Sequence, residues 1–192
     1  MPSREDQLSH LLVRLGEGDD EAMQELFLLE RSSLHRFFMG LGRCAGLAED
    51  LVQGTFLNLW RYRRGFKGRG SAAAYLNRVA INQWRQSYSK EKRRGDAWRD
   101  LVQEWDEGTL RDASSTAEGS ELAYSIWEAI DALPNEQREV FLLHRHQGLS
   151  CPEIAEATQT NLKTVESRLR LGLKKLVERL GQVRQGTLEG GA

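Results

Sequence analysis

The sequence predicts an all-α protein made of two small helical domains that are joined by an acidic linker. Apolar residues recur at helical spacing along most of the 192 residues, and no alternating apolar–polar run typical of a strand is present. A stretch of weak periodicity separates two helical parts, which indicates two domains. We expect a first domain over residues 1–95, the linker over 96–120, a second domain over 121–183 and a flexible tail over 184–192.

The composition is that of a soluble globular protein, with 40% hydrophobic residues, 29% charged residues and a net charge of -1. Cys44 and Cys151 lack the spacing of a disulfide or metal framework, which indicates a reducing compartment. No apolar run approaches the roughly 18 residues of a membrane span, and the first residues are too polar for a signal peptide. We therefore expect a cytoplasmic protein.

Four helices are expected in the first domain. Their apolar stripes are Leu8, Leu11, Leu12 and Leu15; Ala22, Met23, Leu26, Phe27, Leu34 and Phe38; Leu51, Val52, Phe56, Leu59 and Trp60; and Tyr75, Leu76, Val79 and Ala80. Asp19 or Asp20 can cap the second helix, while Gly40 and Gly42 are expected to interrupt the chain after it. The third helix should begin near residue 48. Glycines at residues 65–70 predict a loop before the fourth helix over 72–94.

Charge is unevenly distributed along the chain. Residues 61–94 carry eleven basic side chains and one acidic side chain, Glu91, whereas residues 96–121 carry eight acidic and two basic ones. A clustered basic block is typical of a nucleic-acid surface, although it can also be a solvated face. The acidic linker could occupy this basic face until a partner displaces it.

The second domain contains a helix-turn-helix pattern. Helices are expected from Glu121 and from Pro134, followed by a short helix over 151–157 that Ser150 and Glu153 would begin as a capping box. Residues 158–161 should form the turn, with Asn161 or Thr160 capping the last helix, whose end after Leu180 should fray. That helix should bury Leu162, Val165, Leu169, Leu173, Leu176 and Leu180. Its opposite face is basic and rich in hydroxyl groups, as in helices that enter the DNA major groove, although an ordinary helical hairpin has a similar pattern.

Several motifs, taken in their order, resemble one known family. They are GDDEAMQELF at 18–27, AEDLVQGTFLNLW at 48–60, RVAIN at 78–82 followed by Arg93 and Arg94, ALPNEQREVF at 132–141, and GLS at 148–150 followed by TVESRL at 164–169. The chain resembles the extracytoplasmic-function group of the sigma-70 family over about residues 15–94 and 121–180. The resemblance implies a sigma factor that binds core RNA polymerase, directs promoter-specific initiation and is held by an anti-sigma factor.

The resemblance also implies three sets of contact residues. Polymerase would be bound by Asp50, Leu51, Val52, Gln53, Thr55 and Phe56. The −10 element would be bound by Tyr62, Phe66, Lys67, Arg69, Arg78, Asn82, Arg85, Arg93 and Arg94. The −35 element would be bound by Lys163, Thr164, Glu166, Ser167, Arg168 and Arg170. Gly54, Glu166, Gln159 and Asn161 differ from the residues usual in the family.

Other functions are less well supported by the residues. A sigma-like mimic that sequesters an anti-sigma factor should have lost basic residues from its last helix, yet Lys163, Arg168 and Arg170 remain. A helix-turn-helix regulator that acts without core polymerase would lack the 48–60 motif. No pairing of a nucleophile with a base is present, so we expect neither an enzyme nor a cofactor. The histidines at 144 and 146 with Cys151 fit no standard zinc spacing, and we expect no metal.

Overall fold

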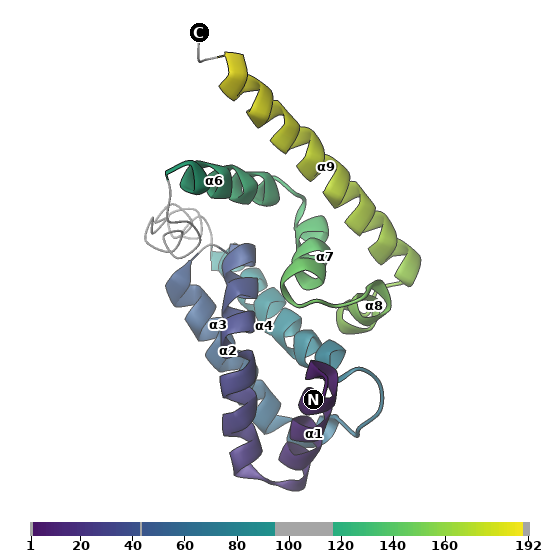
Figure 1. Cartoon of the computed structure of the whole chain (residues 1–192). Helices are drawn as coiled ribbons and strands as arrows, with labels where there is room; N and C mark the ends of the chain where they lie inside the picture. Colours follow the sequence, from purple (N-terminus) through teal and green to yellow (C-terminus); the bar gives the residue numbers. More distant parts are fainter. Residues whose placement is uncertain (1, 43, 95–116, 190–192) are drawn as a thin grey trace.

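The computed structural model describes residues 2–42, 44–94 and 117–189, except for the side chains of 90–94, 117–123 and 182–189. Every regular element in these ranges is a helix (Figure 1). The N-terminal domain contains α1 (Arg4–Glu17), α2 (Asp20–Gly42), α3 (Ala45–Arg61), the 3-10 turn η1 (Arg63–Gly65) and α4 (Ala72–Arg94). The C-terminal domain contains α6 (Ala117–Asp131), α7 (Asn135–His146), α8 (Cys151–Thr158) and α9 (Leu162–Glu189). The predicted all-α class is confirmed.

Capping residues set the boundary between α1 and α2. Ser3 and Asp6 form a capping box at the start of α1, and Gly18 ends the helix with a left-handed φ of 99°. Asp19 Oδ1 then accepts the backbone N–H groups of Glu21 and Ala22 at 3.0 and 3.3 Å, which caps α2. The predicted break and cap are therefore both present.

Of the two glycines expected to interrupt the chain, Gly40 lies within α2, whereas Gly42 is the last residue of this helix. A Cβ atom on Gly40 would lie 2.8 Å from a methyl group of Leu142, and one on Gly42 would lie 3.1 Å from the Trp84 ring. These glycines allow neighbouring elements to approach the α2 backbone closely, and α2 runs to Gly42. The expectation of a break at Gly40 was wrong because close packing explains this glycine.

The helix-turn-helix has the predicted local structure. Glu153 accepts the Ser150 backbone N–H at 2.8 Å, as expected for the capping box of α8, and Asn161 Oδ1 accepts the Lys163 N–H at 2.9 Å at the start of α9. Gln159 connects the two helices with a left-handed φ of 54°. The last helix continues to Glu189, where the sequence predicted fraying and a tail.

The buried stripe of α9 differs from the predicted one. Val165 and Leu176 are buried and Leu169 and Leu180 partly so, but Leu162 and Leu173 are 39% and 43% exposed. Gly172 occupies the position that faces α7, where its Cβ would lie 3.6 Å from Gln137. Because α7 packs against Gly172, the side chain of the adjacent Leu173 points away from the domain. The predicted burial of Leu173 was therefore wrong.

The two domains pack against each other (Figure 1). Helix α8 contacts α4, while α7 and α6 contact α2. The buried apolar residues form one cluster that includes Phe37 and Leu76 of the first domain and Leu142 and Ile154 of the second. The predicted linker between them lies largely outside the described residues, as do its tryptophans, Trp98 and Trp105. No helix in the described part of the chain combines the length and the apolarity needed to cross a membrane.

Candidate nucleic-acid and protein interfaces

Helix α3 presents an exposed stripe at helical spacing. Glu49, Asp50, Gln53, Leu57 and Trp60 are exposed along it, with Leu57 67% and Trp60 37% exposed. Residues spaced by three or four positions share one face of a helix, so these side chains can meet a partner together. Leu57 and Trp60 were not among the predicted contact residues, although their spacing from Asp50 and Gln53 would have identified them.

The other predicted polymerase contacts lie inside the domain. Leu51, Val52, Thr55 and Phe56 are buried, and the Thr55 hydroxyl donates to the Leu51 carbonyl oxygen at 2.7 Å. The Phe56 ring packs edge-on against Phe27 of α2 with 4.9 Å between centroids. In this conformation the four side chains pack into the interior of the domain, on the side of α3 opposite the exposed stripe. They therefore offer no surface to a partner.

The unusual Gly54 is explained by its contact with α4. A Cβ atom at this position would lie 2.2 Å from Gln83 Nε2, and the Asn58 amide donates to Gln83 Oε1 at 2.8 Å. Gly54 therefore faces the interior side of α3, where Gln83 covers it. An acidic side chain at this position would displace Gln83.

The turn between α3 and α4 forms a basic recess. A hollow of about 510 Å³ is lined by Arg61, Tyr62, Arg63, Arg64 and Gly65. Tyr62 is 62% exposed, and the Arg63 guanidinium lies 4.7 Å from the centroid of the Trp60 ring. An exposed aromatic ring among arginines can stack on a base while the guanidinium groups meet phosphates. The three arginines were noted in the basic block but were not predicted as site residues.

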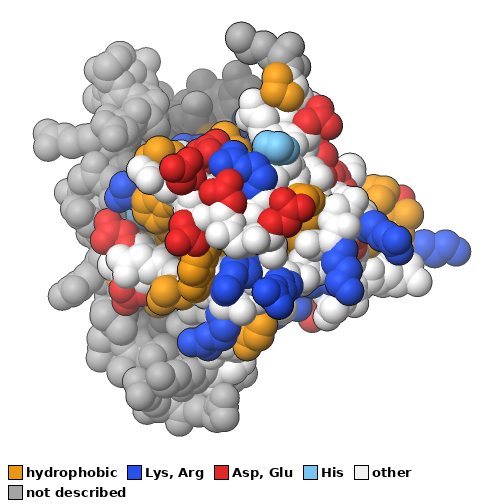
Figure 2. Space-filling view, turned by 90° about the horizontal axis from the view of Figure 1, so that it is seen from below, with side chains coloured by type: hydrophobic (Ala, Val, Ile, Leu, Met, Phe, Trp, Pro, Cys, Tyr) orange, Lys and Arg blue, Asp and Glu red, His pale blue; other side chains and the backbone are white. Residues whose placement is uncertain are grey.

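The glycine-rich loop contains three of the predicted −10 contact residues, two of which are exposed and one buried. Lys67 and Arg69 are exposed, and Figure 2 shows Lys and Arg side chains gathered on part of the face seen from below. Phe66 is buried, its ring 5.4 Å from that of Tyr75, and burial raises the pKa of the Tyr75 hydroxyl. Phe66 was expected to contact the −10 element, but in this structure its ring is buried and anchors the loop to α4.

Helix α4 is held at its start by a residue from α1. The Glu5 carboxylate accepts the backbone N–H groups of Ala72 and Ala73, the latter at 3.1 Å, and the Ser71 hydroxyl lies beside it. A carboxylate at a helix N-terminus satisfies free N–H groups and complements the helix dipole. The loop and the helix are thus fixed to each other by the first turn of the chain.

The predicted DNA-reading residues of α4 differ in their surroundings. Asn82 is exposed, whereas Arg78 pairs with Glu156 of α8 at 3.5 Å and Arg85 pairs with Glu139 of α7 at 2.7 Å. Trp84 is buried and stacks on Tyr88. The side chains of Arg93 and Arg94 lie outside the described part of the structure.

The outer face of α9 has the predicted register. Lys163, Thr164, Glu166 and Arg170 are exposed, opposite buried Val165, while Ser167 and Arg168 are half-buried. Arg168 is held by an ion pair with Glu136 of α7 at 2.5 Å. Of the predicted −35 contacts, Arg168 alone has an ion-pair partner in the described part of the chain.

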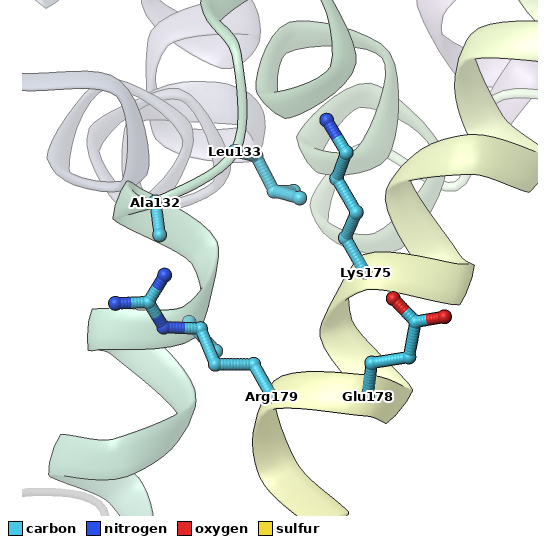
Figure 3. Close-up of a pocket in the computed structure, with 6 residues that line it drawn as sticks. Ala132, Leu133, Lys175, Glu178 and Arg179 are labelled. Atoms are coloured by element: carbon cyan, nitrogen blue, oxygen red, sulfur yellow. The ribbon is translucent and has the colours of Figure 1, made fainter. Parts of the chain in front are cut away.

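A second hollow lies between α6 and α9. It measures about 290 Å³ and is lined by Ala129, Ala132, Leu133, Lys175, Glu178 and Arg179, with Arg179 reaching from α9 toward α6 (Figure 3). It is open and has few polar groups that converge on one point, so it lacks the features of a ligand site. Among the described residues, no group of three or more His, Cys, Asp or Glu side chains is placed to hold a metal ion.

Comparison with known proteins identifies the family. The model for sigma-70 region 2 matches residues 20–94, and that for sigma-70 region 4 matches residues 124–176. The chain is 28% identical over 183 residues to the ECF RNA polymerase sigma factor SigK of Mycobacterium ulcerans, covering 91% of this chain and 94% of the relative. It belongs to the extracytoplasmic-function group of the sigma-70 family. This sigma factor is also 27% identical over 174 residues to the RNA polymerase sigma factor CarQ of Myxococcus xanthus, with 90% and 97% coverage.

Solved structures share the fold of this sigma factor. CnrH in complex with the cytosolic domain of CnrY matches with a TM-score of 0.66 and 22% identity, covering 97% of this chain and all of that one. RpoE in complex with the anti-sigma factor NepR from Bartonella quintana matches with a TM-score of 0.63 and 23% identity, covering 82% and 96%. The protein is a sigma factor that directs transcription, and such factors are regulatory.

Proposed function

We propose that this sigma factor binds core RNA polymerase through the exposed stripe of α3 and reads promoter DNA with two separate surfaces. The observation that carries this proposal is the stripe itself, in which Asp50, Gln53, Leu57 and Trp60 share one exposed face. Charged and amide groups beside exposed apolar side chains are typical of a protein–protein contact with a polar rim. The exposed face is held in place by the buried side chains on the opposite side of α3, which are Leu51, Val52, Thr55 and Phe56.

The −10 surface consists of the basic recess, the glycine-rich loop and the exposed side of α4. Tyr62 can stack on an unpaired base, and Arg61, Arg64, Lys67 and Arg69 can bind the phosphates beside it. Asn82 offers a donor and an acceptor to a base edge. Arg78 and Arg85 extend this surface along α4, and Arg93 and Arg94 are proposed to continue it.

The −35 surface is the outer face of α9. Lys163, Thr164, Ser167 and Arg170 can contact bases and phosphates in a major groove, with Arg168 positioned by Glu136. Exposed Glu166 lies on the same face. It can accept a hydrogen bond from a cytosine amino group or repel a phosphate.

An anti-sigma factor is the proposed inhibitor of this protein, since RpoE of similar fold was solved in complex with one. We also propose that the protein acts in the cytoplasm, where core polymerase and promoters are found, and that it has no catalytic activity of its own. A mimic would bind the anti-sigma factor without supporting transcription, and a simple regulator would bind DNA without polymerase.

Run-off transcription with purified core polymerase and a promoter library tests the function. The wild type should initiate at a defined set of promoters, and Asp50→Ala/Gln53→Ala should lower core binding at least ~10-fold. The matched control Asp20→Ala/Gln7→Ala removes the same residue types from exposed positions on α2 and α1 and should change nothing. Co-purification of the α3 variant with core at wild-type levels would exclude the proposed polymerase surface.

Glu166→Lys tests the −35 surface. If Glu166 reads a base, preference at one promoter position should relax; if it faces a phosphate, binding to all sequences should strengthen and the salt slope should steepen by up to about one unit. Promoter-variant binding at several salt concentrations distinguishes these outcomes. Unchanged binding, salt slope and base preference would show that this face of α9 does not meet DNA.

A further inference from the structure

We propose that a hollow between the two domains, bounded by α4, α7 and α9, binds a small phosphorylated ligand of about the size of a mononucleotide. Arg138 of α7 and Arg168 of α9 would bind its phosphate group. The site goes beyond the proposed function, because binding there needs neither polymerase nor promoter DNA. We call this site the interdomain hollow.

The interdomain hollow has the size of a small-molecule site. It measures about 380 Å³ and lies where α4, α7, α9 and the turn before α9 meet. Ligand sites usually measure about 300–1,000 Å³ and often lie between domains. Part of its wall is aromatic, since it is lined by Trp84 and Tyr88, whose rings stack with 5.7 Å between centroids. Unlike the two hollows described above, it is lined by residues of both domains.

Three arginines from three different helices line this hollow. They are Arg85 of α4, Arg138 of α7 and Arg168 of α9. Two carboxylates of α7 also line it, with Glu139 paired to Arg85 at 2.7 Å and Glu136 paired to Arg168 at 2.5 Å. Three guanidinium groups against two carboxylates leave an excess of one positive charge among these five groups. Guanidinium groups that gather from separate elements are suited to phosphate, which accepts several hydrogen bonds at once.

The excess charge belongs to Arg138, whose guanidinium lacks a close anion. Its side chain is 17% exposed and lies 3.6 Å from the Asp131 carboxylate. It donates instead to the backbone carbonyl oxygens of Leu41, Asp131 and Leu133. Its buried Nε–H group has no acceptor among the described residues, and burial lowers the pKa of Arg138 below its ordinary value. A phosphate in the hollow would provide the missing negative charge.

Glu136 is the group that a phosphate can replace. Its side chain is 72% exposed, whereas that of its partner Arg168 is 24% exposed. An exposed carboxylate gains little from such a pair, because water solvates it almost as well. A phosphate carries more charge and more acceptor oxygens, so it can take over Arg168 while Glu136 turns to solvent. Glu139 is only 12% exposed and is expected to stay with Arg85.

Neutral polar groups complete the lining. The Asn135 amide donates to the Tyr88 hydroxyl at 3.3 Å, and the Thr160 hydroxyl donates to the Thr158 carbonyl oxygen at 3.3 Å. A few polar groups beside an apolar wall are typical of sites that fix the orientation of a small molecule. With the ring of Trp84 nearby, the lining suits a phosphate that is attached to a planar ring.

Two substitutions should change ligand binding in opposite directions. Arg168→Gln removes one guanidinium and should weaken binding about 10-fold, whereas Glu136→Gln removes the competing carboxylate and should tighten it about 3- to 10-fold. The control for the first is Arg61→Gln/Arg64→Gln, which removes the same kind of group from the basic recess. The control for the second is Glu178→Gln, from the exposed pair with Lys174.

Titration calorimetry on the full chain, at a fixed ionic strength of about 0.15 M, is the deciding measurement. AMP and inorganic pyrophosphate are the probes, and adenosine is the control ligand that lacks a phosphate. The wild type should bind one AMP with a Kd on the order of 0.1 mM and bind adenosine at least ~10-fold more weakly. AMP should also raise the midpoint of thermal unfolding, because it binds the folded state. Both control variants should bind AMP as the wild type does.

Several results would overturn the inference. Absence of binding by both AMP and pyrophosphate would exclude the site, and equal binding of AMP and adenosine would show that the phosphate is not recognised. Loss of binding in Arg61→Gln/Arg64→Gln but not in Arg168→Gln would place the ligand in the basic recess. An affinity that is unchanged by both Arg168→Gln and Glu136→Gln, with far-UV helicity intact, would place it elsewhere. None of these results bears on the proposed function, which run-off transcription tests separately.

Discussion

Gln159 is the one described residue other than glycine that adopts a positive φ, at 54°. A side chain in the left-handed region costs about 1–2 kcal/mol, and glycine avoids this cost but loses roughly 0.5–1 kcal/mol of backbone entropy. We therefore predict that Gln159→Gly stabilises the protein by about 0.5–1 kcal/mol. Urea unfolding should show this gain, whereas Gln159→Ala should show none. Equal effects of the two substitutions would show that backbone strain is absent.

Asp19 links acid stability to the start of α2. Its pKa lies below the ordinary value of 3.8 because the Arg14 side chain donates to it, with further help from the N–H groups that it caps. A lowered pKa in the folded state means that the carboxylate stabilises the fold above pH 3.8 and that this contribution is lost as pH falls below it. The stability advantage of the wild type over Asp19→Asn, measured by urea unfolding, should shrink as pH drops through that range. A constant difference would argue against the pair.

At the level of single residues, the sequence identified which positions carry charge but not which aromatic side chains are buried. Lys67 and Arg69 are exposed as expected. Phe66 and Tyr62 both belong to an aromatic-rich turn, and the contact with Tyr75 that buries Phe66 is made nine positions along the chain. A local sequence pattern cannot reveal such a contact, so both rings were predicted to contact the −10 element.

Among the elements, α4 depends on a cap supplied by another helix. Removing the Glu5 carboxylate leaves the Ala72 and Ala73 N–H groups without their partner. We predict that Glu5→Ala lowers the free energy of unfolding by about 1–2 kcal/mol, as for loss of a helix cap. Chemical denaturation provides the measurement. Glu17→Ala, at an exposed position near the end of the same α1, should stay within about 0.5 kcal/mol of the wild type.

Helix boundaries that depend on local chemistry were predictable. The capping box at Ser150 and Glu153, the Asn161 cap and the start of α4 at Ala72 all match the sequence pattern. The errors at Gly40 and at Leu173 have a common cause, because each reflects a glycine that permits close packing of another helix. Periodicity alone does not distinguish such a glycine from a helix breaker.

For the whole molecule, one continuous apolar cluster predicts cooperative unfolding of both domains. Scanning calorimetry of the wild type should give a single transition whose calorimetric and van't Hoff enthalpies agree. A methionine at Gly40 should clash with Leu142 and open the domain contact. In Gly40→Met the two domains should therefore unfold independently, and the calorimetric enthalpy should exceed the van't Hoff value. Two separate transitions in the wild type would contradict this prediction.

The packing of one domain on the other could not be predicted from the sequence. Arg85 and Glu139 are 54 positions apart, and Arg4 and the Gln147 carbonyl are 143 apart. Charge patterning predicted a basic surface that acidic groups could cover. It assigned those groups to the acid-rich linker, because Glu139, Glu153 and Glu156 do not form an acidic cluster in the sequence.

The separation between Arg85 and its partner Glu139 also matters while the protein is being made. A ribosome adds about 5–20 residues per second, so the 54 positions between these partners take roughly 3–11 s to synthesise. During this interval the N-terminal half can fold, but α7 and α8 do not yet exist to cover Arg78 and Arg85. Each nascent chain therefore exposes these arginines within reach of ribosomal and messenger RNA, and their attraction to its phosphates extends over about 8 Å at cellular ionic strength.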